Sequence, residues 1–325
     1  SPNDVRLPGG RYPVYGSSGK TSEAIKFTTE APSIIVGRKG TIDKPIFLEE
    51  KCWAIDTTFF ADKFPLDNPK YLFYLLDSIN LRSLNESTGV PSLSRDALHS
   101  IPVSIPPLPE QKKIAEILSG IDKKIMLIQK EIASLKVLRT AILEQSLEQM
   151  KDCPVHPLHE VTKKVTVGIV SKPADHYVSK GVTTLRSMNI KEGKIDFKDL
   201  RFISEESNQF FKKSIIREGD ILTVRTGVPG TSAVAPAYLD GANCIDIIIS
   251  TPADGVDSDF LCLQINSERI KSKVLSGQGG LAQQHFNIGA MRVLDILLPS
   301  FDTQKEISAS VLSVSHCIDS MHKQR

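Results

Sequence analysis

Residues 106–125 read PPLPEQKKIAEILSGIDKKI, and a related stretch, PSFDTQKEISASVLSVSHCI, occupies residues 299–318. Each stretch starts with proline and continues with the apolar spacing of a helix. Proline ends a preceding strand but fits the first turn of a helix, because that turn has no use for its missing N–H. Gln111 and Ile114 recur as Gln304 and Ile307 at the same separation. Two copies of one strand-to-helix switch predict an internal duplication.

Features ahead of the two switches also repeat, at slightly smaller separations. PSIIVGRKGTI at 32–42 resembles GDILTVRTGVP at 219–229, and the same order of apolar residues precedes Asp56 and Asp246. The alternation of apolar residues before each proline predicts a strand in both copies, through Ile101, Val103 and Ile105 and through Leu294, Ile296 and Leu298. Short helices are expected at 69–77 and 259–270. Each repeat should therefore be a β-rich globular part followed by a helix.

The first long helix is the clearest element, expected to start at Pro109 and to end near residue 150. Its apolar residues recur every 3.5 positions, the period of a coiled-coil seam: Ile114, Ile117, Ile121, Ile125, Ile128, Ile132, Leu135, Leu138 and Ile142. A helix of this length is roughly 60 Å long at about 1.5 Å per residue. Its expected partner is the second helix, where Thr303-x-x-Glu306 resembles a capping box.

Composition bounds the class of protein. The 325 residues, 40% of them hydrophobic, suffice for two domains, and 40 Lys and Arg against 38 Asp and Glu leave a formal charge of +2. That charge gives little support to a polyanion partner. The five cysteines are isolated, which favours a reducing cytoplasm over a disulfide framework or a zinc site. No apolar run reaches the roughly 18 residues of a membrane span, and no signal peptide is recognisable.

Enzymatic interpretations find weak support. GSSGKT at 16–21 ends like a phosphate-binding loop, but Val14 stands where that motif requires its first glycine. Ser17 and Lys20 match S-x-x-K without the partner motifs of a serine acyl-enzyme. Neither a methyltransferase N/D-P-P-Y/F motif nor a glycine-rich loop for S-adenosylmethionine is visible. The main alternative is a coiled-coil adaptor that binds only protein.

The chain resembles the specificity (S) subunits of type I restriction-modification systems. The resemblance covers essentially the whole sequence, and the residues that carry it are YPVYGSSG at 12–19, GRKGT at 37–41, IPV at 101–103 and PPLPEQ at 106–111, followed by Ile114, Leu118 and Asp122. The second copy departs from the pattern, with Ser300-Phe301 in place of Pro-Leu and Thr303 in place of glutamate.

The resemblance implies a fold of the α/β (α+β) class with two β-rich target-recognition domains in pseudo-twofold repeat, separated by long helices that pack as an antiparallel coiled coil. The expected boundaries are 1–108 and 151–301 for the domains and 109–150 and 302–325 for the spacer helices. Because residues 151–180 have no counterpart ahead of Gly10, and the second helix is the shorter one, we expect an N-terminal segment and the end of that helix to be missing.

In this family each recognition domain contacts one half of a split site on double-stranded DNA. The resemblance therefore implies a non-catalytic, cytoplasmic subunit that docks two methyltransferase (M) subunits and restriction (R) subunits, with S-adenosylmethionine bound by the methyltransferase. The expected docking residues are Glu110, Gln111, Ile114, Ile117, Ile121, Gln304 and Ile307.

Candidate DNA contacts follow from chemistry, because Arg, Asn and Gln bond base edges while Lys, hydroxyl groups and glycine N–H groups hold phosphates. In the first domain these are Tyr15, Ser17, Ser18, Lys20, Arg38, Lys39 and Thr41. In the second they are Arg186, Ser187, Asn189, Arg225 and Thr226, with Gln278, Gln283 and Gln284 in the loop SGQGGLAQQ.

Overall fold

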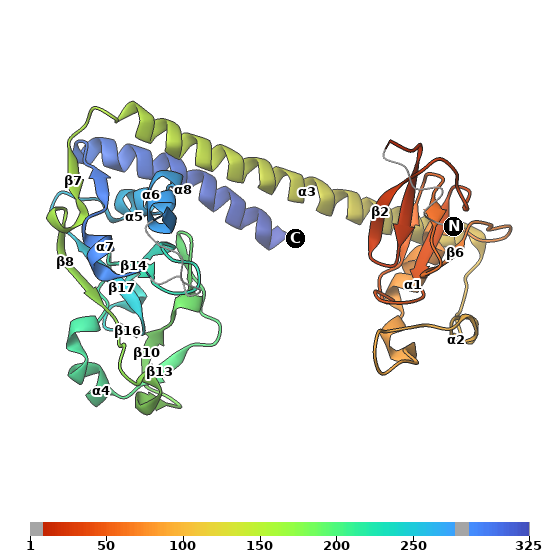
Figure 1. Cartoon of the computed structure of the whole chain (residues 1–325), viewed down its shortest axis with the longest axis horizontal. Coiled ribbons are helices and arrows are strands. Elements are labelled where there is room, and N and C mark those ends of the chain that lie inside the picture. Colours follow the sequence, from red (N-terminus) through yellow and green to blue (C-terminus); the bar gives the residue numbers. More distant parts are fainter. Residues whose placement is uncertain (1–8, 277–285, 325) are drawn as a thin grey trace. The chain divides into compact units, whose positions relative to one another are not determined.

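The computed structural model describes residues 9–276 and 286–324, and the chain divides into two compact units, Ser1–Leu127 (unit 1) and Ile128–Arg325 (unit 2). The long helix α3, Leu108–Gln149, contributes residues 108–127 to unit 1 and 128–149 to unit 2. The expected fold class is confirmed, since a long helix joins two β-rich regions of mixed α and β structure (Figure 1). None of the described helices combines the length and the hydropathy needed to cross a lipid bilayer.

The described residues of unit 1 form two three-stranded sheets. In the first, β1 pairs antiparallel with β2 and parallel with β5; in the second, β3 lies between β4 and β6 and is antiparallel to both. The bounds are β1 Tyr12–Gly16, β2 Gly19–Ala24, β3 Ser33–Gly37, β4 Ile46–Leu48, β5 Trp53–Ala54 and β6 Thr58–Ala61, followed by α1 Pro69–Ser78, the 3₁₀ turn η2 Leu81–Leu84 and α2 Arg95–His99. Every residue of β3 is buried, so this strand forms the centre of the core.

Unit 2 is larger. Outside residues 277–285 and 325, it has two four-stranded sheets, in the orders β16-β10-β13-β9 and β15-β14-β17-β8, and two two-stranded sheets, β11-β12 and β18-β7. The strands are β7 Val155–Pro157, β8 Thr162–Val167, β9 Tyr177–Val178, β10 Val182–Leu185, β11 Ile190–Lys191, β12 Lys194–Ile195, β13 Arg201–Ile203, β14 Ile221–Val224, β15 Ser232–Val234, β16 Asn243–Cys244, β17 Ile247–Pro252 and β18 Asp295–Leu297. The helices are α4 Glu205–Phe210, α5 Ser258–Ile265, α6 Glu268–Ser276, α7 Ile288–Arg292 and α8 Phe301–Gln324, with 3₁₀ turns at Leu158–Glu160 (η3), Pro173–His176 (η4), Ser187–Asn189 (η5), Lys212–Ser214 (η6) and Ala237–Leu239 (η7).

The internal repeat is visible in strand pairing. The parallel pair β1–β5 corresponds to β10–β16, and Ile55 N–H donates to Tyr15 O as Ile245 N–H donates to Leu185 O. The antiparallel triple β4-β3-β6 corresponds to β15-β14-β17. Helices α1 and α5 follow these strands at equivalent positions of the two repeats, and each is capped by an Asn or Asp side chain. Helices α2 and α7 are also equivalent in position. The repeat therefore extends from sequence to topology.

A buried glutamine joins each globular part to its long helix. Gln111 Oε1 accepts a hydrogen bond from the N–H of Asn68, the N-cap of α1, at 2.8 Å, and Gln304 Oε1 accepts one from Asp257, the N-cap of α5, also at 2.8 Å. Both Nε2 groups donate back to the proline carbonyl that precedes the helix, at 3.0 Å. The two glutamines are 2% and 1% exposed, so these bonds are shielded from water.

Helix α8 packs antiparallel against α3 within unit 2 (Figure 1). Ile318 lies in one apolar cluster with Ile128 and Ile132, whereas Val311 lies in another with Leu143 and Leu147. The antiparallel helix pair is thus confirmed, but the buried residues of the contact do not follow a strict seven-residue repeat.

Four local expectations are wrong. The strand expected through Ile101, Val103 and Ile105 does not form, since the structure assigns no strand to residues 101–105. Leu138, placed in the seam by the 3.5 period, is 48% exposed, because α3 turns a different face toward Phe260 and Leu263 of α5 where it reaches them. Ser300 caps α8 in place of Thr303, which lies inside the first turn and donates its N–H to the Ser300 hydroxyl. The helix expected at 259–270 is two helices, because α5 ends at Ile265 before α6 starts at Glu268.

Candidate nucleic-acid interface

In unit 1 the structure brings two predicted contact segments together. Ser17 and Ser18 form the turn of the β1–β2 hairpin, and residues 38–41 form a turn that follows β3. A Cβ added to Gly37 would lie 1.9 Å from Thr41 O and 3.1 Å from Ser17 Cβ, and one added to Gly40 would lie 3.1 Å from Ser17 Oγ. Only glycine permits the hairpin and the turn to pack this closely.

Backbone hydrogen bonds hold the 38–41 turn in place. Arg38 and Lys39 donate their N–H groups to Thr57 O at 2.8 and 3.2 Å, and Gly40 donates to Pro91 O at 2.8 Å. The side chains of Ser18, Lys20, Arg38 and Lys39 are exposed on this framework. The arrangement presents the hydroxyl groups of Ser17 and Ser18 and three cations on one surface, which we name the hairpin–turn surface and define as residues 15–20 and 38–41.

Individual side chains of this surface differ in how strongly their contacts within the protein hold them. The Arg38 guanidinium lies 6.0 Å from the ring centre of Phe59 and makes a long 3.5 Å bond to Asp56 O, so it can turn toward a ligand. Lys20 makes an exposed ion pair of 3.4 Å with Glu23. Tyr15 packs against Ile35 and Leu48, and its burial raises the pKa of its hydroxyl.

In unit 2 the corresponding arginine is held inside the protein. Arg225 Nη1 donates to Asp246 Oδ1 at 2.6 Å, Thr226 Oγ1 donates to Asp246 Oδ2 at 3.1 Å, and the Arg225 side chain is only 12% exposed. Asp246 occupies the left-handed region, with φ +51°. Arg225 is therefore tied to a carboxylate where Arg38 has only the carbonyl of Asp56, and the two repeats differ at this position.

The predicted residues after β10 have structural contacts. Asn189 is 1% exposed, accepts from the N–H of Arg186 and donates to the carbonyls of Asp196 and Lys198 at 2.8 Å. Its amide is fully used in closing this loop, so we leave Asn189 out of the proposed interface. Arg186 donates to Asp199 O and is half-buried, like Ser187. Gln278, Gln283 and Gln284 lie outside the described residues.

The segment GSSGKT does not form a phosphate-binding loop. A loop of that class joins a strand to a helix whose N-terminus faces the phosphates. Here residues 16–21 close the hairpin between β1 and β2, and a strand follows in place of the helix. The hairpin geometry thus removes the structural basis of the nucleotide-hydrolase interpretation.

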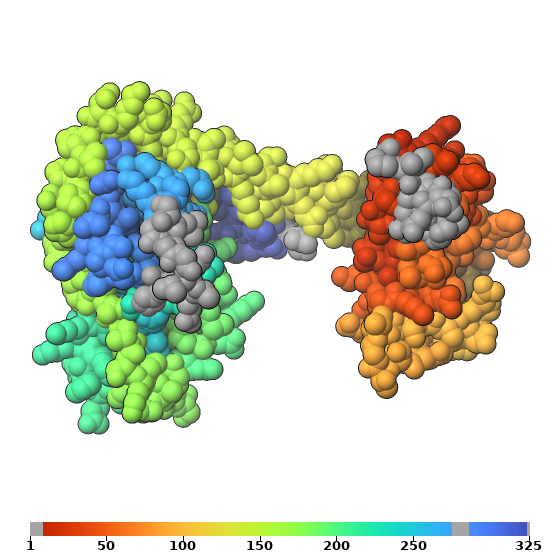
Figure 2. Space-filling view, in the orientation of Figure 1, coloured from red at the N-terminus to blue at the C-terminus, as the bar shows by residue number. Residues whose placement is uncertain are grey.

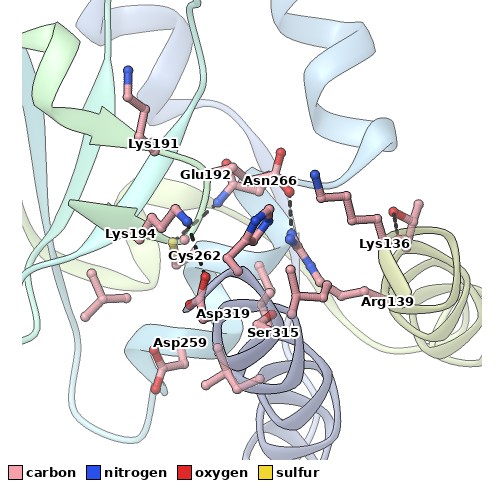
Figure 3. A pocket seen from close by; sticks show the side chains of 17 residues that line it. Lys136, Arg139, Lys191, Glu192, Lys194, Asp259, Cys262, Asn266, Ser315 and Asp319 are labelled. Carbon is pink, nitrogen blue, oxygen red and sulfur yellow. Dashed lines mark hydrogen bonds and ion pairs between the residues drawn. The ribbon is translucent and has the colours of Figure 1, made fainter. Parts of the chain in front are cut away.

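A charged pocket of about 440 Å³ lies within unit 2, between the β11–β12 turn, α3, α5 and α8 (Figure 3). Glu192 on the turn forms ion pairs with Arg139 of α3 and, at 2.6 Å, with Lys271 of α6, and Lys194 forms one of 3.3 Å with Asp319 of α8. Ion pairs therefore connect the β11–β12 turn to the three helices α3, α6 and α8. Sequence reasoning missed this contact, because its members are scattered over 181 positions, from residue 139 to 319.

We expect these ion pairs to give unit 2 a pH-dependent stability. Burial alone would raise the pKa of Glu192, but Lys271 and Arg139 outweigh it and lower that pKa below its ordinary 4.5. A carboxylate with a lowered pKa stabilises the fold above its unfolded pKa and ceases to do so as pH falls through the folded pKa. Glu192→Gln should therefore lower the free energy of unfolding by about 0.5–1 kcal/mol at pH 7 and by much less at pH 3.5.

Chemical denaturation of both proteins at the two pH values checks this expectation. Glu131→Gln, at an exposed position of α3, is the matched control and should change little at either pH. A Glu192→Gln penalty that grows as pH falls would contradict the assignment.

The expected docking residues fall into three groups, which are exposed, buried and half-buried. Glu110, Ile117 and Ile121 are exposed, the two isoleucines by 56% and 50%. Gln111 and Gln304 are buried in the joints described above, so they cannot contact a partner. Ile114 and Ile307 are half-buried, and Ile307 of α8 packs against the end of α3. The sequence does hint at these joints, because a glutamine recurs five residues after Pro106 and after Pro299.

Comparison with known proteins places these features in a family. Residues 2–137 match the family model described as type I restriction modification DNA specificity domain. The MjaVIII specificity subunit of Methanocaldococcus jannaschii is 25% identical over 329 residues, covering 91% of this chain and 72% of that protein. The EcoBI specificity subunit of Escherichia coli is 23% identical over 332 residues, covering 90% of this chain and 68% of that protein.

Solved structures agree with the fold. The type I restriction-modification S subunit from M. genitalium has a TM-score of 0.66 at 15% identity, covering 99% of this chain and 86% of its own. A chain from work on complex assembly and conformational transition of the type I R-M system has a TM-score of 0.52 at 14% identity, covering 99% and 90%. Together with the duplicated β-rich parts and the paired helices, the family-model match and these relatives support a specificity subunit of a type I restriction-modification system, and such subunits are the non-catalytic DNA-recognition components of those enzymes.

Proposed function

We propose that this chain recognises a bipartite site on double-stranded DNA, one half through each unit, and docks methyltransferase subunits through its long helices. The observation that carries the proposal is the repeated construction: the same strand pairings place a polar turn after β3 in unit 1 and after β14 in unit 2. Two copies of one recognition fold suit two short runs of bases. The methyltransferase, in this proposal, binds S-adenosylmethionine and carries out the chemistry.

For unit 1, we assign DNA contact to the hairpin–turn surface. Hydroxyl groups of Ser17 and Ser18 and the ammonium groups of Lys20 and Lys39 suit phosphates, while the exposed guanidinium of Arg38 can donate two bonds to guanine O6 and N7. Because the backbone bonds of residues 38–40 fix the turn before DNA arrives, little ordering entropy opposes binding.

For unit 2, we assign Arg225 and Thr226 a positioning role. An arginine that is 12% exposed and paired with Asp246 would have to break that pair before it could contact a base. Its exposed neighbours Gly227 and Val228 extend the same turn toward solvent, and Val228 is 70% exposed. The backbone of that turn and the side chains of Arg186 and Ser187 are the proposed contacts in this unit.

For the partner surface, we assign the exposed face of α3 in unit 1. Ile117 and Ile121 lie four residues apart and hence on one face of the helix. Glu110 is exposed in the first turn of the same helix. An apolar face with a charged end is the pattern expected of a helix that packs against another protein. Restriction subunits would then join the complex through the methyltransferase or through the chain itself.

We expect Arg38→Ala to weaken binding to the specific site by about 10- to 100-fold, corresponding to about 1–3 kcal/mol, and to leave non-specific binding unchanged. The measurement is fluorescence anisotropy with the assembled complex of this chain and its methyltransferase, on cognate and scrambled duplexes, across a salt series. The near-neutral charge of the chain makes the complex, and not the isolated subunit, the suitable material.

Lys26→Ala is the matched control, because Lys26 is exposed beyond the end of β2 that is opposite to the hairpin turn, and it should bind as wild type does. Base substitutions confined to one half-site should abolish the Arg38 effect, and those in the other half-site should not. An equal loss on all duplexes would reduce Arg38 to a phosphate contact, and salt-independent binding would contradict the DNA interface altogether.

A further inference from the structure

The connection that follows β10 in unit 2 is much longer than its counterpart in unit 1. In unit 1, β1 and β2 pair antiparallel and are joined by a turn of two residues, Ser17 and Ser18. The equivalent strands of unit 2, β10 and β13, also pair antiparallel, but residues 186–200 connect them. We name this connection the insert. It contains the hairpin β11–β12, whose tip is formed by residues 191–194.

Internal hydrogen bonds close the insert at its base. Asp196 N–H donates to Asn189 O at 2.7 Å, and the Asn189 amide donates to the carbonyls of Asp196 and Lys198. The guanidinium of Arg186 is bonded to the chain that returns from the hairpin, because its Nη2 donates to Asp199 O. The direction of the Arg186 side chain is therefore set by the position of the whole insert, and not by β10 alone.

The tip of the insert is attached to helices of unit 2 (Figure 3). The Glu192 carboxylate forms ion pairs with Arg139 on α3 and with Lys271 on α6. These two helices are neighbours, and Figure 2 shows α3, in yellow-green, next to the blue residues of α6 on one face of unit 2. Gly193 N–H also donates to Ser232 O of β15 at 2.9 Å. The tip is thus held by elements that are distant from it in the sequence.

The ion pairs of Glu192 are the main attachment of the tip to the helices. None of the four residues at the tip has an apolar side chain, and the charged pocket of about 440 Å³ lies between the tip and helices α5 and α8. Arg139 and Lys271 are 20% and 27% exposed, whereas Lys194 and Asp319 are 61% and 48% exposed. Solvent and salt therefore screen the Glu192 pairs less than the pair of Lys194 with Asp319.

We propose that Glu192 is a positioning residue for DNA recognition by unit 2. Its ion pairs with α3 and α6 hold the insert, so that Arg186 and Ser187 face their half-site in a fixed orientation. This inference rests on the proposed function, in which Arg186 and Ser187 contact DNA. Glu192 acts through these residues and contacts no DNA itself. Hydrogen bonds to base edges depend on distance and angle, so a displaced insert reads its half-site less well. The two-residue turn of unit 1 is independent of this attachment.

Glu192→Gln tests the proposal in the assembled complex of this chain and its methyltransferase. Fluorescence anisotropy gives Kd for the cognate duplex and for duplexes with base substitutions in one half-site, and the ratio of the two constants is the discrimination at that half-site. The half-site of unit 2 is the one at which Arg186→Ala loses discrimination. We expect Glu192→Gln to lower the discrimination there by about fivefold or more, and to leave the discrimination at the other half-site unchanged.

Variants on the helix side give an independent test, because they leave the insert itself unaltered. Arg139→Gln removes one partner of Glu192 and should lower the discrimination at the same half-site. Arg139→Lys retains an ion pair and should keep most of the wild-type discrimination. Asp295→Asn is the matched control, since it removes the ion pair of Asp295 with Lys273 in the same unit without touching the insert, and it should bind as wild type does.

A double-mutant cycle distinguishes positioning from a general loss of stability. In an Arg186→Ala background, Glu192→Gln should cause little further loss of discrimination, because the side chain that it positions is absent. Additive losses, or equal losses at both half-sites, would overturn the proposal. If Arg186→Ala loses discrimination and Glu192→Gln does not, the positioning role alone is wrong. If Arg186→Ala changes discrimination at neither half-site, the proposed DNA contact of the insert is wrong, and the positioning role with it.

Discussion

Replacing Gln304 with alanine is expected to lower the free energy of unfolding of unit 2 by about 3 kcal/mol. The substitution removes the acceptor for the N–H of Asp257 and the donor for the carbonyls of Pro299 and Gly255. Each buried polar group left without a partner costs about 1–3 kcal/mol. Gln111→Ala should weaken unit 1 in the same way, because it releases the N–H of Asn68 and the Asp67 carboxylate.

Differential scanning calorimetry, with hydrogen exchange to attribute each transition to a unit, measures the effect. For a unit of this size, about 3 kcal/mol corresponds to a fall in Tm of about 6–12 °C. Gln145→Ala, on the exposed surface of α3, is the control and should stay within about 0.5 kcal/mol of wild type. A Gln304→Ala protein as stable as Gln145→Ala would show that the joint contributes nothing to the fold.

Gln304→Glu distinguishes the contribution of the bond that Gln304 accepts from that of the two bonds that it donates. The carboxylate retains the bond from Asp257 N–H but cannot donate to the two carbonyls while it is ionised. We expect destabilisation at pH 8 at least as large as that of the alanine variant, with partial recovery near pH 5 as the carboxyl binds a proton.

Introducing aspartate at both Ile117 and Ile121 is expected to prevent assembly with the methyltransferase without unfolding the chain. Both side chains are at least half exposed, so the substitutions cost little in the isolated protein. Burying two isoleucines in an interface contributes about 3–6 kcal/mol, and two carboxylates would in addition lose their hydration there. The affinity for the partner should therefore fall by more than 100-fold.

Size-exclusion chromatography with light scattering on the mixed subunits measures this assembly. Val137→Asp is the matched control, since Val137 is 70% exposed on the same helix but belongs to unit 2 and to no predicted contact. If the Ile117 and Ile121 variant assembles as Val137→Asp does, the docking face lies elsewhere. Circular dichroism of both variants shows whether the helix is intact.

The segments of the candidate DNA surface could be picked out from the sequence, whereas the surroundings of single side chains could not, for physical reasons. The chemistry of Ser17 and Arg38 predicts a DNA contact, and the structure places their segments in contact through Gly37 and Gly40. Asn189 satisfied the same chemical criterion, yet the loop after β10 uses its whole amide internally. A sequence states which donors exist but not which acceptors fold next to them.

The sequence by itself determined the duplication, the positions of the two long helices and the resemblance to a family, because prolines, heptad spacing and repeated motifs are local features of the chain. The tertiary structure alone decided that Gln111 and Gln304 are internal joints, that Arg225 is paired with Asp246, and that the described part of unit 1 has an open edge where unit 2 has β8. These features depend on contacts between residues dozens of positions apart. Burial and hydrogen bonding are set by the chain's packing in space, which no local pattern specifies.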